Sequence, residues 1–113
     1  NAEPSLFVRS DKKLIQIYIR DILYVEGLKD YAKIYQVSGE KVIIRESLQN
    51  IMNRLKRHDF IRTHRSYIIS VNKISSLAGN QIFINDNKIP ISRGYRPEVL
   101  EIFKGRGILG ERN

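Results

Sequence analysis

The sequence feature that most limits the possible folds is a two-residue alternation of apolar and polar side chains, repeated in short segments between turn signals. It runs through residues 13–19 and again through residues 31–37, as expected for strands with one buried face. Ser38-Gly39 then predicts a tight turn into a return strand over residues 41–46. Strands joined this closely are expected to be antiparallel, because parallel neighbours need a long crossover connection.

The rest of the chain adds short strands and two helices. Further strands are expected at residues 21–27, 73–77, 81–85 and 88–92. The last of these should lie at a sheet edge or carry a bulge, because Pro90 lacks a donor N–H. Residues 47–59 change to a helical period, with Ser47 placed to cap the first free N–H groups. Residues 95–105 fit a second helix with Pro97 in its first turn. The predicted fold class is mainly β with two short helices.

The length of 113 residues corresponds to one domain. We expect residues 1–6 to be a linker or a leftover of cloning, residues 7–104 to be the folded domain, and residues 105–113 to be a loose tail. No apolar run is long enough to cross a bilayer, and the start of the chain has no signal-peptide pattern. A cytoplasmic location without a membrane partner is therefore expected.

The residue types argue against catalysis. The chain has no cysteine, so disulfides and thiolate zinc sites are excluded. Its two histidines and scattered acids form no recognisable metal cluster or nucleophile–base pair. The sequence therefore predicts a binding protein that is not an enzyme and has no cofactor and no metal site.

The charge of the chain points to a polyanionic partner. Twenty Lys and Arg against twelve Asp and Glu give a formal net charge of +8. A surplus of this size suits a nucleic acid or an anionic membrane face, although a merely soluble Lys-rich surface is also open. The positive charge is uneven along the chain, since residues 60–85 contain no acid at all. This segregation favours a charged face.

The stretch "FIRTHRSYIISVNKI", residues 60–74, places cationic side chains inside the most core-like segment of the chain. From Tyr67 onward the alternation of a strand is regular, but residues 62–66 are all polar. We therefore expect a strand that is interrupted at residues 62–66 by a bend or a single helical turn. Because buried arginines without acids would be costly, Arg62, His64 and Arg65 are expected to point outward to an anion.

Each of these residues also has a simpler interpretation. Arg62 could pair with Asp59 or Glu46 in a structural salt bridge. His64 could serve a local hydrogen bond. Arg65 has the strongest functional case, because its planar guanidinium suits both phosphate oxygens and the O6/N7 edge of guanine.

Three motifs together resemble a known family. "FIRTHRSYIISVNKI", followed by "IPISRGYR" and preceded by "DILYVEGLKDYAKIY", is similar to the signature of the LytTR DNA-binding domain, the output module of many bacterial response regulators. The resemblance covers roughly Phe7 to Phe103. It implies an elongated, antiparallel multi-sheet fold with a few short helices. It also implies sequence-specific binding of double-stranded DNA through loops in successive major grooves, with the minor groove touched between them.

The resemblance further implies a two-component transcriptional regulator with a receiver domain upstream. The isolated domain would be monomeric, and two copies would pair on repeated sites of one DNA. The residues that the resemblance assigns to DNA contact lie in three loops: Lys29, Asp30, Tyr31 and Lys33; then Arg62, His64, Arg65 and Ser66; then Arg93, Tyr95 and Arg96. Gly94 stands where the family often has a basic residue.

Within these loops several roles stay open. Lys29 and Lys33 would bind phosphates. Asp30 could accept from a cytosine amine or simply form a turn. Tyr31 could donate to a phosphate or pack on its sheet. Ser92 and the following helix N-terminus could also bind phosphate.

A second interpretation is a basic β domain that binds single-stranded nucleic acid or RNA by stacking bases on Tyr18, Tyr24, Tyr31 and Tyr35. A protein-interaction module is a third. The sequence does not reveal the DNA target, the regulated genes, or whether transcription is activated or repressed.

Overall fold

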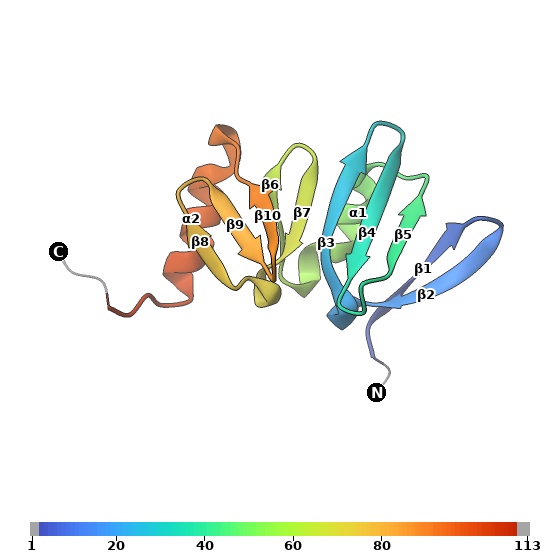
Figure 1. Cartoon of the computed structure of the whole chain (residues 1–113), viewed down its shortest axis with the longest axis horizontal. Coiled ribbons are helices and arrows are strands. Elements are labelled where there is room, and N and C mark those ends of the chain that lie inside the picture. The colour runs from blue at the N-terminus through green and yellow to red at the C-terminus, as the bar shows by residue number, and fades with distance from the viewer. Residues whose placement is uncertain (1–2, 111–113) are drawn as a thin grey trace.

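The computed structural model describes residues 3–110 and has three antiparallel sheets side by side along the long axis of the molecule (Figure 1). The molecule measures 55 × 35 × 25 Å, so the elongated, mainly β architecture with two α-helices is confirmed. The strands are β1 (Ser5–Ser10), β2 (Lys13–Tyr18), β3 (Ile22–Leu28), β4 (Tyr31–Gln36), β5 (Lys41–Ile44), β6 (Phe60–His64), β7 (Tyr67–Ser70), β8 (Ser76–Ala78), β9 (Gln81–Ile84) and β10 (Asn87–Pro90). The α-helices are α1 (Leu48–Leu55) and α2 (Arg96–Gly105), and the short 3-10 helices are η1 (Ile19–Asp21), η2 (Lys56–His58), η3 (Val71–Lys73) and η4 (Arg93–Tyr95).

The central sheet has five strands in the order β5-β4-β3-β7-β6. A two-stranded sheet, β1-β2, lies beyond β5, and a three-stranded sheet, β10-β9-β8, lies on the other side of the central sheet (Figure 1). Pro90 is the last residue of β10, an edge strand, as its missing N–H predicts.

Two separate hydrophobic cores hold the layers together. The first lies between α1, the β1-β2 hairpin and one face of the central sheet, and includes Val25, Leu55 and Ile68. The second lies between the opposite face, the three-stranded sheet and α2, and includes Tyr24 and Val99. Neighbouring residues Tyr24 and Val25 thus serve different cores, because successive side chains of a strand point to opposite faces.

Helix α1 forms largely as its sequence predicts. The side chain of Ser47 accepts a hydrogen bond from the backbone N–H of Asn50 at 3.1 Å, which caps the helix. Leu48, Ile51 and Leu55 form the buried stripe. The helix ends at Leu55, earlier than the predicted 47–59 segment, and continues as η2.

Several boundaries differ from the sequence-based expectation. Ser5 and Leu6, which were assigned to a leading segment, belong to β1, where Ser5 pairs with Tyr18 and Leu6 is buried. Residues 73–77 are not one strand, because η3 ends at Lys73 and β8 begins at Ser76. The expected loose tail, residues 105–113, begins at the last residue of α2, and residues 111–113 lie outside the described part of the chain.

The largest correction concerns residues 60–70. The sequence predicted one interrupted strand, but β6 and β7 are two antiparallel strands that pair from Phe60 with Ser70 to His64 with Tyr67. The register shifts between Arg62 and His64, so Thr63 is the extra residue of a β-bulge. The apparent loss of alternation in the sequence therefore marks a hairpin with a bulge.

Candidate nucleic-acid interface

The three predicted contact loops lie along one edge of the molecule, the upper edge in Figure 1. They are the β3–β4 turn at Lys29-Asp30, the β6–β7 turn at Arg65-Ser66, and η4 at the start of α2. Backbone hydrogen bonds join all three. The N–H of Gly27 donates to the Ser66 carbonyl at 2.7 Å, which ties the first loop to the second. The second loop is tied to the third by the N–H of Ser92, which donates to the Thr63 carbonyl at 2.9 Å.

The β6–β7 turn is held by its own side chains. The Nη2 of Arg62 donates to the Arg65 carbonyl at 2.6 Å, and the backbone N–H of Ser66 donates to Nδ1 of His64 at 3.0 Å. The imidazole of His64 also meets the ring of Tyr67 edge-on, with 5.7 Å between ring centroids. These contacts hold the β6–β7 turn in a closed conformation.

Of the three side chains predicted to point outward, only that of Arg65 is exposed. Arg62 and His64 are half-buried, and their contact with an anion stays a prediction. The alternative of an Arg62 salt bridge is not what the structure has: Asp59 pairs with Arg106 at 3.5 Å, and Glu46 accepts from Asn50. Arg62 instead satisfies a backbone carbonyl, which no pairing of charges in the sequence could suggest.

Thr63, the bulged residue, is fully buried although it lies between the polar residues Arg62 and His64. Its Oγ1 and the Nε of Arg62 are buried without a hydrogen-bond partner among the described residues. Both atoms lie at the bulge, where an extra residue is left out of the strand ladder. The backbone of this segment also holds the other two loops, because the carbonyls of Thr63 and Ser66 accept the hydrogen bonds from Ser92 and Gly27.

The β3–β4 turn is more open. Lys29 adopts a left-handed conformation, with φ of 48°, and both Lys29 and Asp30 are exposed. Tyr31 is 44 % exposed, and the guanidinium of Arg45 lies 5.7 Å from the centre of its ring. Lys33 is half-buried, and its Nζ lies 5.4 Å from the ring centre of Tyr35. Lys33 is therefore directed along the sheet face, whereas Lys29 is at the tip.

The third loop divides its residues between exposure and structure. Arg93 and Gly94 are exposed, and Tyr95 is half-buried. Arg96 donates from Nη1 to the Gly79 carbonyl at 2.9 Å and to the side chain of Asn80 at 2.5 Å. It therefore fastens the start of α2 to the β8–β9 turn.

A tyrosine–carboxylate cluster lies in the central sheet behind the turns, and sequence analysis missed it. The carboxylate of Glu26 accepts from the hydroxyl of Tyr35 at 2.8 Å and from that of Tyr67 at 3.0 Å. Burial, followed by the contact with Glu26, raises the pKa of both hydroxyls above the ordinary tyrosine value. Glu26 thus joins β3, β4 and β7. In the sequence, the only sign of this contact between strands is the position of each residue along its own strand.

The cluster bears on the aromatic stacking alternative. Tyr24 is buried and stacks on Tyr35, with 4.2 Å between ring centroids. Two of the four tyrosines that would stack on bases are therefore stacked on each other.

The comparisons with known proteins agree with this fold. The model of the LytTr DNA-binding domain family matches residues 12–104, so the chain belongs to that family. A solved LytTr DNA-binding domain of a response regulator from Bacillus cereus has the same fold, with a TM-score of 0.77 at 18 % identity over 90 % of this chain and 98 % of that one.

Curated relatives include the sensory transduction protein LytT of Bacillus cereus, 27 % identical over 83 % of this chain and 40 % of the relative. A response regulatory protein of Vibrio cholerae is also 27 % identical, over 68 % of this chain and 33 % of its own length. The chain spans at most about two fifths of the length of these relatives.

Within residues 3–110, no group of three or more His, Asp or Glu side chains is placed to hold a metal ion. Neither α-helix is long and apolar enough to cross a membrane.

Proposed function

We propose that this domain binds double-stranded DNA sequence-specifically through the edge formed by the β3–β4 turn, the β6–β7 turn and η4. The observation that carries the proposal is the fastening of all three loops to one another by the Gly27–Ser66 and Ser92–Thr63 hydrogen bonds. Loops with fixed spacing can be matched to the fixed spacing of grooves. The 55 Å long axis is sufficient to follow one turn of B-DNA, about 34–36 Å.

The loops would contact successive major grooves and touch the minor groove between them. Arg65 would read a guanine, because its exposed side chain projects from the turn that Arg62 and His64 close. Lys29, Lys33 and Arg93 would bind phosphates, since a cationic side chain can contact a phosphate oxygen without being aligned to a base edge. Asp30, Tyr31, Ser66 and Tyr95 would complete the contacts, whereas Arg62, His64 and Arg96 would mainly hold the loops in place.

In the whole protein the domain would be the output module of a two-component transcriptional regulator in the cytoplasm. The curated relatives support this part of the proposal, because they are sensory transduction and response regulatory proteins longer than this chain. A receiver domain would precede it. The isolated domain would be a monomer in solution, and two copies would sit on paired repeats of one DNA site.

Salt dependence of duplex affinity tests the proposal. If about six phosphates are neutralised, log K should fall with log[salt] at a slope of about −5. Fluorescence anisotropy with a labelled duplex, followed across salt concentrations, gives this slope. A slope near zero at measurable affinity would rule out DNA binding that depends on contacts with the phosphate backbone.

Competition by single strands separates the two nucleic-acid functions. Unlabelled single-stranded DNA of the same sequence should displace the labelled duplex poorly. Equal or better displacement by the single strand would favour the stacking alternative.

Sedimentation of the free domain as a stable dimer would contradict the proposed monomer.

A further inference from the structure

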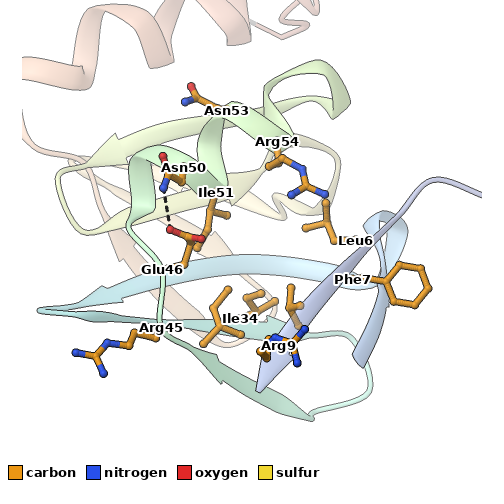
Figure 2. Close-up of a pocket in the computed structure, with 12 residues that line it drawn as sticks. Leu6, Phe7, Arg9, Ile34, Arg45, Glu46, Asn50, Ile51, Asn53 and Arg54 are labelled. Atoms are coloured by element: carbon orange, nitrogen blue, oxygen red, sulfur yellow. Dashed lines mark hydrogen bonds between the residues drawn. The ribbon is translucent and has the colours of Figure 1, made fainter. Parts of the chain in front are cut away.

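A pocket of about 460 Å³ lies between β1, the end of β5 and α1, on the first core's side of the central sheet (Figure 2). None of the residues proposed to contact DNA lines it. Its size falls within the range of small-molecule sites, about 300–1,000 Å³.

The floor of the pocket is apolar. It is formed by buried side chains of the first core: Leu6, Val8, Ile34, Ile44 and Ile51. These residues come from β1, β4, β5 and α1, so four elements meet beneath the opening. A floor of this kind can bind the apolar part of a ligand, but its side chains have no polar group that could bind the phosphate backbone of DNA.

The rim of the pocket is polar and carries positive charge. Arg9 lines it from β1 and Arg54 from α1. In Figure 2 the guanidinium of Arg54 hangs from α1 beside Leu6. Neither arginine forms a salt bridge within the described part of the chain, where the ion pairs involve Arg20 and Arg106. Their charge is available to a ligand.

The one acid of the rim is already satisfied. Glu46 accepts from the side chain of Asn50 at 2.8 Å and from the N–H of Ser47 at 3.1 Å. These hydrogen bonds, Asn50 first, hold the pKa of Glu46 below its ordinary value, so it stays ionised. Figure 2 shows Glu46 at the Asn50 side of the pocket, across from Arg54. The rim therefore carries both positive and negative side chains.

We propose that this pocket binds a small amphipathic anion, with an aromatic or short alkyl body on the apolar floor and a carboxylate beside Arg54. The apolar floor selects the body of the ligand. The guanidinium of Arg54 selects its charge and suits a planar carboxylate. This proposal does not depend on DNA binding.

Titration of the isotope-labelled full chain with 1-naphthylacetate, followed by amide NMR shifts, tests the site. The expected shifts cluster at Leu6–Val8, Ile34, Ile44 and Ile51, with dissociation constants in the millimolar range or below. The uncharged analogue 1-naphthylacetamide should bind about three- to fivefold more weakly, as suits loss of a partly exposed charge contact. Acetate alone, which lacks the apolar body, should not shift these amides.

Matched variants separate the site from general attraction by a basic protein. Arg54→Gln should weaken 1-naphthylacetate binding about three- to fivefold. Arg57→Gln removes the same charge from an exposed position outside the pocket and should leave binding unchanged. Both substitutions are at the surface, and the amide spectrum reports that each variant is folded.

Three results would overturn the proposal. Absence of shifts up to low-millimolar ligand, or shifts away from the floor residues, would mean that the pocket is not a site. Equal binding of the acid and the amide would remove the role of Arg54. Equal weakening by Arg54→Gln and Arg57→Gln would show that only the net charge of the protein matters.

Discussion

The β6–β7 turn and the β3–β4 turn lie on the same edge, yet they are held in different ways. Arg62 and His64 hydrogen-bond across the β6–β7 turn, and its Ser66 carbonyl accepts from Gly27. In the β3–β4 turn, Lys29 and Asp30 are both exposed, and neither side chain hydrogen-bonds to another residue that the structure describes. One turn is fixed at its tip, and the other is fixed only at its base.

This difference suggests different work for the two turns. Reading a base edge requires a bidentate fork at a defined position and angle, whereas a phosphate can be bound by a mobile ammonium. The fixed turn carries Arg65, and the free turn carries Lys29. The expectation is that discrimination between sequences belongs to the β6–β7 turn, and sequence-independent affinity to the β3–β4 turn.

The largest expected effect is the loss of discrimination in Arg65→Ala. A bidentate arginine–guanine pair contributes roughly 1–3 kcal/mol of discrimination. Affinity for the cognate duplex should therefore fall much more than affinity for a random duplex, as measured by anisotropy on both. Thermal unfolding controls for stability, and the exposed side chain of Arg65 predicts no change there. If the ratio of the two affinities is unchanged in a folded variant, Arg65 is only a phosphate contact.

Gly27→Ala should strain the link between the two turns, although alanine keeps the backbone N–H. A Cβ at Gly27 would lie 2.9 Å from Cδ1 of Leu48 and 3.0 Å from its Cγ, so the buried Leu48 side chain, α1 or β3 must shift. Overpacking of this kind costs roughly 1–3 kcal/mol of unfolding free energy. Because the N–H of Gly27 holds Ser66, DNA affinity should fall as well.

Urea denaturation measures the loss of stability in Gly27→Ala, and Gly94→Ala is its matched control. A Cβ at Gly94 meets no heavy atom within 4 Å, so that variant should be as stable as the parent. Equal stability of the Gly27 and Gly94 variants would show that Leu48 yields freely and that the link is not tight.

Arg62→Met tests whether the closure of the β6–β7 turn is what makes Arg65 discriminate. Methionine retains most of the apolar stem of Arg62 but cannot donate to the Arg65 carbonyl. Loss of one hydrogen bond of about 1 kcal/mol predicts a roughly fivefold lower ratio of cognate to random affinity, less than in Arg65→Ala. Arg57→Met, at an exposed position, controls for the lost charge. If Arg62→Met weakens both duplexes equally, Arg62 itself binds phosphate and is not a positioning residue.

The sequence predicted the helices and strands better than the contacts that fasten the loops. Alternation located β4, and the helical stripe with Ser47 located α1, because burial and capping depend on residues a few positions apart. The loop positions followed from the resemblance to the family.

The contacts that fasten the loops could not be read in the same way. Arg62 donates to a backbone carbonyl, and that carbonyl is near only once the turn has closed. Burial of Thr63 depends on a bulge, which shifts the face on which every preceding side chain lies. The Glu26 cluster joins β3 to β7 across 41 residues of sequence, so it depends on the sheet order β4-β3-β7. Strand pairing, which a single sequence does not reveal, decides each of these.

The smallest expected effect is at Lys33, at the base of the β3–β4 turn. Lys33→Ala should weaken cognate and random duplexes about equally and make the salt slope shallower by about one unit, as for one lost phosphate contact. The loss of affinity should be no larger than in Lys29→Ala, because Lys33 lies over Tyr35 instead of at the tip. Anisotropy across salt concentrations, with both duplexes and both variants, gives the four slopes. A change in the ratio of cognate to random affinity for either lysine would place sequence reading in the β3–β4 turn and reverse the division of work between the two turns.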